Sequence, residues 1–314
     1  VTSGVPQGSV LGPLFFVLYI NDLPESLKNS CKLYADDSKI IAVVRDIASE
    51  MSIQEDVDAL TDWTMDWLLR LNVEKCKIMH FGSESETDMQ YAINDLVSGH
   101  RVPLEVSQCE KDLGIHITPD LRWKTHIEKI VAKANKILGM LVKTFSNRDV
   151  DIWKKLYVSL VRPHLEFAST VWSPHLLGDI DMLEKVQERA TKIPFELRGL
   201  SYEERLKVWG ITSLRDRRIR GDLIQMYKNR NALEDINWFT GPTLAPVTQT
   251  RSASRNDTRL VRETFPTRMQ NDFSHSVTVR HEFYLNRVVG HWNNLVSSQI
   301  SAPSLNSFKA RIDC

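Results

Sequence analysis

The chain has 314 residues, with 40 Lys/Arg balanced by 40 Asp/Glu and an apolar fraction of 42%. This composition is that of an ordinary globular protein, and the length provides for two or three domains. No run of 18 apolar residues and no signal peptide occur, so we expect no transmembrane segment, no membrane partner and an intracellular location, in the nucleus or the cytoplasm. The four cysteines lack metal-site spacing, which predicts reduced thiols with no disulfide partner.

The zero net charge hides an asymmetry along the chain. Residues 1–100 carry 7 Lys/Arg and 16 Asp/Glu, residues 101–200 carry 16 and 13, and residues 201–314 carry 17 and 11. An acidic first third suits a divalent-metal region, and a basic last third suits contact with phosphate. Solvated helix faces explain the same charges without any function.

The chain opens on a loop punctuated by glycine and proline, Ser-Gly-Val-Pro-Gln-Gly-Ser at positions 3–9. Gly12-Pro13 then places a proline in the first turn of a helix that runs to about Asp22. Because this helix is apolar nearly all round, we expect it to be buried.

A β-hairpin is predicted next, from strands at Lys32–Ala35 and Lys39–Val44. Asp36, Asp37 and Ser38 are turn-forming residues, so the hairpin carries two carboxylates at its tip. The remaining elements of this part are a helix at Ile47–Arg70, a strand at Val73–Phe81, two short strands within Tyr91–Val106 and a strand at Leu113–Ile117.

From Asp120 onward the hydrophobic period becomes helical. Helices are predicted from Asp120 to about Phe145, at Asp149–Trp172 with a break at Pro163, and at Gly178–Lys192, Tyr202–Val208 and Leu214–Asn231. Ser201 and Glu204 form a capping-box pattern before the fourth of these, and Gly210 is its natural stop. A loop at Phe239–Pro266 and a closing unit at about His281–Arg311 complete the chain.

The hairpin carboxylates and the opening loop have residue types that suit nucleotidyl transfer. Carboxylate oxygens at a rigid tip are ligands that Mg²⁺ prefers, and two such ions can bind the attacking and the leaving oxygen at a phosphorus. Gly8 lets backbone approach a base or sugar closely, and Gln7 offers donors and acceptors. Each segment alone also fits a plain turn with no metal or nucleotide role.

In combination, these segments resemble the reverse transcriptases of non-LTR (LINE-type, jockey-like) retrotransposons. The similarity in the first part comprises Ser3–Ser9, Tyr19–Pro24, Leu33–Asp37 and Leu71–Gly82. It continues through Asp112–Ile115, Leu121–Ile127, Leu156–Glu166, Leu183–Lys192, Phe283–Val289 and Trp292-Asn293. An intron maturase or a telomerase-like polymerase is a third interpretation, which the segments after Leu121 disfavour.

The resemblance implies an RNA-directed DNA polymerase that binds template RNA, primer DNA and dNTPs and uses two Mg²⁺ ions. Asp36 and Asp37 would be the catalytic metal ligands, and Tyr34 would lie beside the primer end. The nucleotide and template site would be lined by Pro6, Gln7 and Gly8. Lys75 would neutralise or protonate the pyrophosphate leaving group, although a surface lysine at a strand start fits equally.

The fold that the resemblance implies is α+β, with a partial right-hand palm followed by an all-helical thumb. We expect a palm at residues 1–118, a thumb and connection at 119–238, a linker at 239–280 and a C-terminal helical unit at 281–314. The family has a further metal-binding Asp and basic fingers upstream of the Pro-Gln-Gly loop. We therefore expect this chain to be an inactive fragment; the alternative is a decayed or domesticated remnant that at most binds RNA.

Two further groups are candidates for nucleic-acid contact. Four arginines, Arg215, Arg217, Arg218 and Arg220, lie on one predicted helix and could hold template phosphates, but salt bridges or solvation explain them as well. The tryptophans at 63, 67, 123, 153, 172 and 292 are expected in the core, with base stacking as the alternative.

Overall fold

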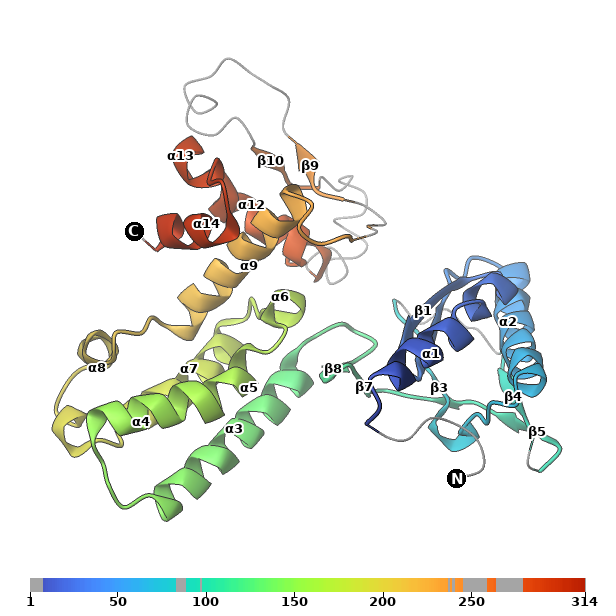
Figure 1. Ribbon diagram of the computed structural model, residues 1–314, viewed down its shortest axis with the longest axis horizontal. Helices are drawn as coiled ribbons and strands as arrows, with labels where there is room; N and C mark the ends of the chain where they lie inside the picture. The colour runs from blue at the N-terminus through green and yellow to red at the C-terminus, as the bar shows by residue number, and fades with distance from the viewer. Residues whose placement is uncertain are drawn as a thin grey trace. The chain divides into compact units, whose positions relative to one another are not determined.

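Helices and small two-stranded sheets make up the first third of the chain, and helices dominate the rest (Figure 1). This computed structural model describes residues 8–82, 89–96, 98–236, 238, 241–244, 259–263 and 279–313. Two compact units are formed, by residues 1–108 and by residues 109–314. The fold class is α+β, as predicted. Among the described residues, no helix has the length and apolarity needed to cross a membrane.

The first unit combines helices with three strand pairs. Its helices and turns are α1 (Leu11–Ile20), the 3-10 turn η1 (Leu23–Ser26), α2 (Ile47–Asp66) and the 3-10 turn η2 (Val73–Lys75). Its strands are β1 (Ser30–Tyr34), β2 (Asp37–Ile41), β3 (Lys77–Ile78), β4 (Ala92–Asp95), β5 (His100–Pro103) and β6 (Glu105–Val106). β1–β2 and β4–β5 are antiparallel hairpins, whereas β3 pairs with β6 in parallel.

Helix α2 anchors this unit. Asp46 begins it with a capping box, in which its side chain accepts from the Ser49 backbone N–H at 2.9 Å. Trp63 packs in a small core with Ile20 and Leu23, and its indole Nε1 donates to the Asp22 carboxylate at 3.2 Å. The predicted helix therefore starts at the expected residue and ends four residues before the expected Arg70.

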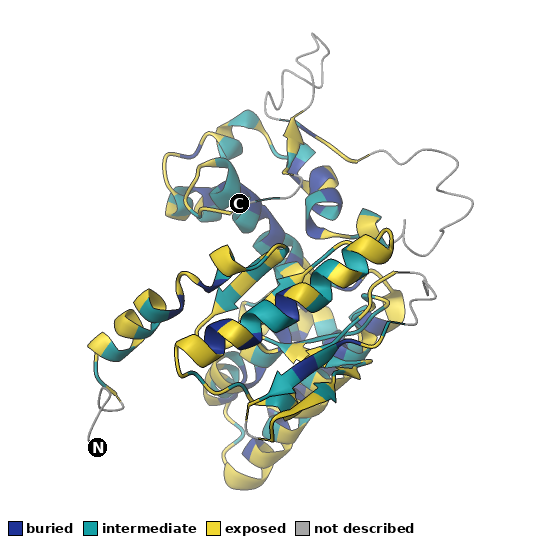
Figure 2. Cartoon of the chain, turned by 90° about the vertical axis from the view of Figure 1, so that its right-hand side faces the viewer, coloured by how far each residue is buried: buried dark blue, intermediate teal, exposed yellow. Residues whose placement is uncertain are grey.

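The prediction that the first helix is buried is wrong for the described chain. In α1 only Ile20 is buried, and Figure 2 shows most of the helix as exposed or intermediate. Leu18 is 66% exposed and Leu14 is 53% exposed. Phe16, Tyr19 and Ile20 pack toward the Trp63 cluster, while the apolar side chains on the other sides of α1 meet no cover among the described residues.

The predicted strand at 73–81 is also mostly wrong. Residues 73–75 form the 3-10 turn η2, and only Lys77–Ile78 pair as a strand. The turn is closed by the Cys76 backbone N–H donating to the Val73 carbonyl at 3.1 Å. The β-branched residues that indicated a strand are too few beyond this turn to sustain a longer ladder.

The second unit begins with a short hairpin and continues as helices. The hairpin strands are β7 (Glu110–Asp112) and β8 (Ile115–Ile117), turned at Leu113-Gly114. The helices are α3 (Lys124–Thr144), α4 (Val150–Leu156), the π-turn η3 (Tyr157–Val161), α5 (Arg162–Glu166), α6 (Ser169–Trp172), α7 (Leu177–Thr191), the 3-10 turn η4 (Phe195–Leu197), α8 (Tyr202–Trp209) and α9 (Leu214–Arg230). Beyond them lie β9 (Thr243–Leu244), β10 (Leu260–Val261), α12 (Tyr284–Asn293), α13 (Ser297–Ile300) and α14 (Leu305–Ile312).

One large core joins α3, α4, α5 and α7, which lie against one another in Figure 1. Trp153, Tyr157 and Trp172 are fully buried in it, which confirms the core role predicted for two of the tryptophans. The helix predicted at Asp149–Trp172 is interrupted at Phe167-Ala168, where Ala168 has a φ of 51°, and not at Pro163. Pro163 lies in the first turn of α5, where its missing N–H removes no helical hydrogen bond.

A second core lies between α9, α12 and α14. Trp292 and Phe308 are fully buried there, and the Tyr227 hydroxyl donates to the Ala302 carbonyl at 2.6 Å. Asn293 of the Trp-Asn segment has a structural role, because its side chain forms hydrogen bonds with both the backbone N–H and the carbonyl of Leu260 in β10. Most of the loop predicted at 239–266 and of the linker predicted at 239–280 falls outside the described residues.

Candidate functional site: the β1–β2 hairpin

The carboxylate-bearing hairpin has the tightest connection that two antiparallel strands can have. Tyr34 in β1 pairs with Asp37 in β2, so that only Ala35 and Asp36 form the turn. Ala35 has a φ of +52°, while Asp36 is not among the residues with positive φ. Positive φ is a conformation that glycine adopts readily and alanine rarely. The strands are therefore closed through a strained alanine.

Both carboxylates are open to solvent at this tip. Asp36 and Asp37 are exposed, and Tyr34, beside them, is 65% exposed. Because side chains alternate across a strand, Tyr34 and Asp37 share a face with the cross-strand pair of Lys32 and Lys39. The tip thus presents acidic oxygens, one aromatic ring and two lysines on one accessible surface.

The base of the hairpin is fixed by helix α2. The buried Asp56 carboxylate accepts the backbone N–H of Lys28 at 2.7 Å and that of Asn29 at 2.9 Å, just before β1. The Asn29 side chain adds bonds to Asp56 and to Ser52, each at 2.8 Å. A buried carboxylate with several N–H partners resists displacement. The segment just before β1 is therefore held in a fixed position.

The opening loop is described only from Gly8. Pro6 and Gln7 lie outside the described residues. Gly8 is exposed with a φ of +87°, and a Cβ there would meet nothing within 4 Å. Backbone conformation, and not a close neighbour, therefore requires glycine at this position. The Ser9 hydroxyl accepts the Leu11 backbone N–H at 3.3 Å at the start of α1.

Lys75 is exposed in the turn η2. Within the described part of the chain, no hydrogen bond or ion pair joins it to Asp36 or Asp37. The structure therefore does not bring Lys75 into contact with the hairpin, and its predicted role stays a prediction.

The donor set of the hairpin fits part of a magnesium site. Two carboxylates provide hard oxygens, which Mg²⁺ prefers, and their exposure leaves room for water and phosphate ligands. Over the residues that the structure describes, no group of three or more acidic, histidine or cysteine side chains is placed to hold a metal ion. The two carboxylates would thus be only a part of the ligand set of a metal ion.

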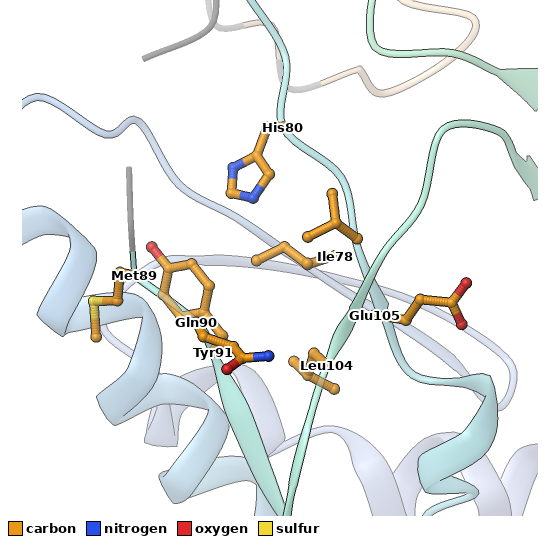
Figure 3. Close-up of a pocket in the computed structure, with 8 residues that line it drawn as sticks. Ile78, His80, Met89, Gln90, Tyr91, Leu104 and Glu105 are labelled. Atoms are coloured by element: carbon orange, nitrogen blue, oxygen red, sulfur yellow. The ribbon is translucent and has the colours of Figure 1, made fainter. Parts of the chain in front are cut away.

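A pocket of about 460 Å³ lies elsewhere in the first unit (Figure 3). It is lined by Ile78, His80, Met89, Gln90, Tyr91, Leu104, Glu105 and Val106. Figure 3 shows the His80 and Tyr91 side chains pointing toward the same space. The Tyr91 hydroxyl is buried without a hydrogen-bond partner, and burial raises its pKa. No residue predicted from sequence to act in catalysis lines this pocket.

The arginines of α9 are mostly engaged within the second unit. Arg217 pairs with Glu166 of α5, and Arg220 forms a two-pronged pair with Asp313 at 2.6 and 2.7 Å. Arg218 is buried, and Arg215 is exposed. Three of the four side chains therefore serve packing or internal ion pairs, which supports the structural interpretation over phosphate binding.

Sequence reasoning did not single out Ala35, Lys32 or Lys39. The two lysines follow from period-2 alternation once Tyr34 is placed on the exposed face. The strain at Ala35 has no such signal, because alanine is unremarkable in most turns and its positive φ appears only when the strand register is known.

Comparison with known proteins shows that the first part of the chain is similar to a polymerase family. Residues 1–140 match the family model described as reverse transcriptase (RNA-dependent DNA polymerase). The chain is 26% identical over 224 residues to the RNA-directed DNA polymerase from mobile element jockey of Drosophila melanogaster, covering 66% of this chain and 24% of that protein. No solved structure matches the chain.

Two further curated proteins show the same similarity. The probable RNA-directed DNA polymerase from transposon X-element of Drosophila melanogaster is 26% identical over 208 residues, covering 62% of this chain and 22% of that protein. The one from transposon BS of the same species is 25% identical over 223 residues, with 66% and 24% covered. The chain spans about a quarter of the length of these curated relatives.

The first 140 residues are therefore similar to the reverse transcriptase family. Beyond these residues, the chain is similar to RNA-directed DNA polymerases of mobile elements, which confirms the resemblance seen in the sequence.

Proposed function

We propose that this chain forms the C-terminal palm and the thumb of an RNA-directed DNA polymerase that copies a retrotransposon RNA. The observation that carries the proposal is the hairpin tip, where one exposed carboxylate lies in a strained two-residue turn and another follows it, above a hydrogen-bonded base. The family match over residues 1–140 supports the same activity.

The strain at Ala35 supports a functional tip. A non-glycine residue in the left-handed region costs about 1–2 kcal/mol. Asn, Asp or Gly would relieve this cost in a purely structural turn. Alanine keeps the turn short and small while Asp36 is held at the apex, and such strain is typical of active sites that fix a side chain in one position.

In this proposal Asp36 and Asp37 hold the Mg²⁺ ions together with a carboxylate that other parts of the full polymerase provide. When bound, the metal supplies charge neutralisation at the reacting phosphate and lowers the pKa of the attacking hydroxyl. Tyr34 packs beside the primer end on the same exposed face as Asp37. Pro6, Gln7 and Gly8 line the nucleotide and template site, and Lys75 meets the leaving pyrophosphate.

The proposed domain roles follow the same assignment. Residues 1–118 form the palm, residues 119–238 the thumb and connection, residues 239–280 a linker and residues 281–314 a C-terminal helical unit. The template is RNA, the primer is DNA and the substrates are dNTPs.

The test is primer extension by a polymerase in which this chain is completed to the length of its relatives. Replacement of Asp36 by Ala is expected to lower the extension rate by about a thousandfold or more, because loss of a metal ligand removes several kcal/mol of transition-state stabilisation. The fold should be retained, since Asp36 is exposed and at a turn.

Asp62→Ala is the matched control, because Asp62 is an exposed aspartate of the same unit, on helix α2 and outside the hairpin. It should extend primers at the wild-type rate. Extension by Asp36→Ala at the rate of this control would show that the hairpin is not the metal site and would favour a non-catalytic remnant that at most binds RNA.

A further inference from the structure

The pocket of the first unit contains a buried tyrosine with an unsatisfied hydroxyl group. Tyr91 is 2% exposed, and within the described residues its hydroxyl has no hydrogen-bond partner. Burial, and then the negative charge of Glu50, raise the pKa of Tyr91, so the hydroxyl keeps its proton at neutral pH and can donate. Because buried polar atoms in folded proteins nearly always have a partner, this hydroxyl indicates a binding position for a ligand atom that accepts a hydrogen bond.

The walls of the pocket are fixed before any ligand binds. The Gln54 side chain on α2 donates to the Ala92 carbonyl at 2.8 Å and accepts the Ala92 backbone N–H at 2.9 Å, next to Tyr91. Residues 104–107 then join the two walls, since their backbone N–H groups donate to the carbonyls of Tyr91 and Ile78, both at 2.8 Å. A ligand therefore meets a preformed site and orders little of the chain when it binds.

The cavity has the size and the lining of a site for one flat ring system. Its volume of about 460 Å³ lies within the range of small-molecule sites and is much larger than a water molecule, which takes about 30 Å³. The rings of His80 and Tyr91 have their centroids 6.5 Å apart, with planes tilted by 34°, and Figure 3 shows both directed toward the same space. Ile78, Leu104 and Val106 supply apolar surface around them. A ligand ring can therefore contact aromatic and aliphatic side chains together.

The described residues that line the pocket include no lysine or arginine to bind an acidic ligand. Glu105 is the one carboxylate among them, Lys77 already pairs with it, and Figure 3 shows Glu105 directed away from His80 and Tyr91. The negative charge of Glu50, which acts on Tyr91, opposes an anion as well. A phosphate or a carboxylate would find no compensating charge here, so nucleotides are disfavoured as occupants. The neutral donor and the apolar surface suit an uncharged ligand instead.

We propose that this pocket binds a small, uncharged aromatic molecule that carries a hydrogen-bond acceptor, such as a lactam fused to a benzene ring. The ligand ring lies against His80 and Tyr91, and its carbonyl oxygen accepts a hydrogen bond from the Tyr91 hydroxyl. No lining residue belongs to the β1–β2 hairpin, and binding needs neither metal nor nucleic acid. The inference therefore goes beyond the proposed polymerase function and does not depend on it.

The test is a titration of quinolin-2-one, an uncharged two-ring lactam, with the 314-residue chain, followed by ligand-observed NMR. We expect a dissociation constant below about 1 mM, which a ligand of this size reaches in a preformed site. Quinoline-2-carboxylate has the same rings and a negative charge, and it should bind about tenfold more weakly or not at all. Absence of quinolin-2-one binding would overturn the proposal, and so would equal affinity for the two compounds.

Two variants locate the ligand in the pocket. Tyr91→Phe removes the donor and keeps the ring, and it should weaken quinolin-2-one binding by about three- to tenfold, the effect of one neutral hydrogen bond. Val106→Trp enlarges a side chain of the wall and should weaken binding by about tenfold or more. Val43→Trp is the matched control, because Val43 is an exposed valine of the same unit that does not line the pocket. Wild-type affinity in both pocket variants would contradict the assignment.

Urea unfolding separates a ligand site from a structural role of the hydroxyl. Because the Tyr91 hydroxyl has no partner within the described chain, Tyr91→Phe should lower the urea midpoint by less than about 0.2 M. A larger loss would show that the hydroxyl is bonded inside the protein and would overturn the proposal. Asp36→Ala should bind quinolin-2-one as the wild type does, so failure at the pocket leaves the polymerase proposal standing.

Discussion

The two units of this chain use their apolar residues in different ways. Among the described residues, six hydrophobic side chains are buried in residues 1–108 and 26 in residues 109–314. The first unit also leaves large apolar side chains of α1 exposed, whereas the second encloses four tryptophans almost completely. Since burial of apolar area is the main source of stability, the helical unit should supply most of the stability of the chain.

The two units also differ clearly in net charge. Residues 1–108 carry 8 Lys/Arg and 17 Asp/Glu, and residues 109–314 carry 32 and 23. Helices α1 and α3 illustrate the difference, because one exposes leucines and the other exposes lysines. The first unit is therefore acidic and carries the carboxylate hairpin, whereas the second unit is basic.

The largest change in stability is expected when a tryptophan is removed from the helical core. Trp153 is fully buried, and its indole Nε1 donates to the Asn147 carbonyl at 2.6 Å. Trp153→Ala should lower the free energy of unfolding of the second unit by about 3–5 kcal/mol, through lost burial and a cavity. Urea unfolding followed by helical circular dichroism measures this change.

Trp67 of the first unit is the matched comparison, because it is 41% exposed. Trp67→Ala should cost about 1 kcal/mol or less, since much of its ring remains in water in the folded state. Equal destabilisation by the two substitutions would contradict the view that the second unit carries most of the stability.

A smaller effect is expected from protonation of His126. This side chain is 2% exposed, and burial, with the charges of His116 and Lys129, lowers its pKa to about 4. The folded state therefore favours neutral His126, and its contribution is complete above pH 6.5 and lost as pH falls toward 4. Between pH 7.5 and 5 the second unit should lose about 2 kcal/mol of stability.

His126→Asn isolates this effect. The Asn oxygen can still accept the His116 backbone N–H, which the His126 Nδ1 accepts at 3.2 Å, but the amide does not titrate. Urea midpoints of the variant should change less between pH 7.5 and 5 than those of the wild type. Parallel losses in both proteins would assign the pH dependence to other groups.

The smallest effect on stability is expected on α1. Replacing Leu14 and Leu18 together by Lys should change the free energy of unfolding by less than about 0.5 kcal/mol, because both side chains are more than half exposed. The same change should reduce self-association, since contiguous exposed apolar surface favours it. Light scattering and urea unfolding check the two parts, and a loss comparable with Trp153→Ala would show that α1 is buried in solution.

Local signals in the sequence were sufficient for much of the fold. The capping box at Ser201 and Glu204 forms as predicted, and Gly210 ends α8 with a φ of 57°. The hairpin forms as predicted, because turn residues and β-branched neighbours act over a few positions. Its predicted turn is wrong by one residue, since Ala35 and Asp36 form the turn while Asp37 and Ser38 pair in β2, which ends at Ile41. These features depend on contacts within a short segment.

Features that depend on distant contacts could not be predicted in the same way. The apolar α1 is exposed because burial requires a partner surface, which periodicity does not identify. Two arginines of α9, Arg217 and Arg220, form ion pairs with partners 51 and 93 residues away, Glu166 and Asp313, which the sequence alone does not identify. The helical region continues through the π-turn at 157–161 and past Pro163, and it is interrupted at Phe167-Ala168 instead. At the site, the strand register was needed to place Lys32 and Lys39 on the same face as Tyr34. The positive φ of Ala35 likewise became known only from the backbone geometry.

The most direct test of the central claim, that the hairpin carboxylates bind the catalytic metal, is a metal-switch measurement on the completed polymerase. Asp36→Cys replaces a hard oxygen ligand by a thiolate, which binds Cd²⁺ better than Mg²⁺. We expect primer extension by this variant to be lost in Mg²⁺ and partly restored by micromolar Cd²⁺ added to Mg²⁺, while the wild type gains nothing. Extension by Asp36→Cys in Mg²⁺ alone at the wild-type rate would contradict the claim.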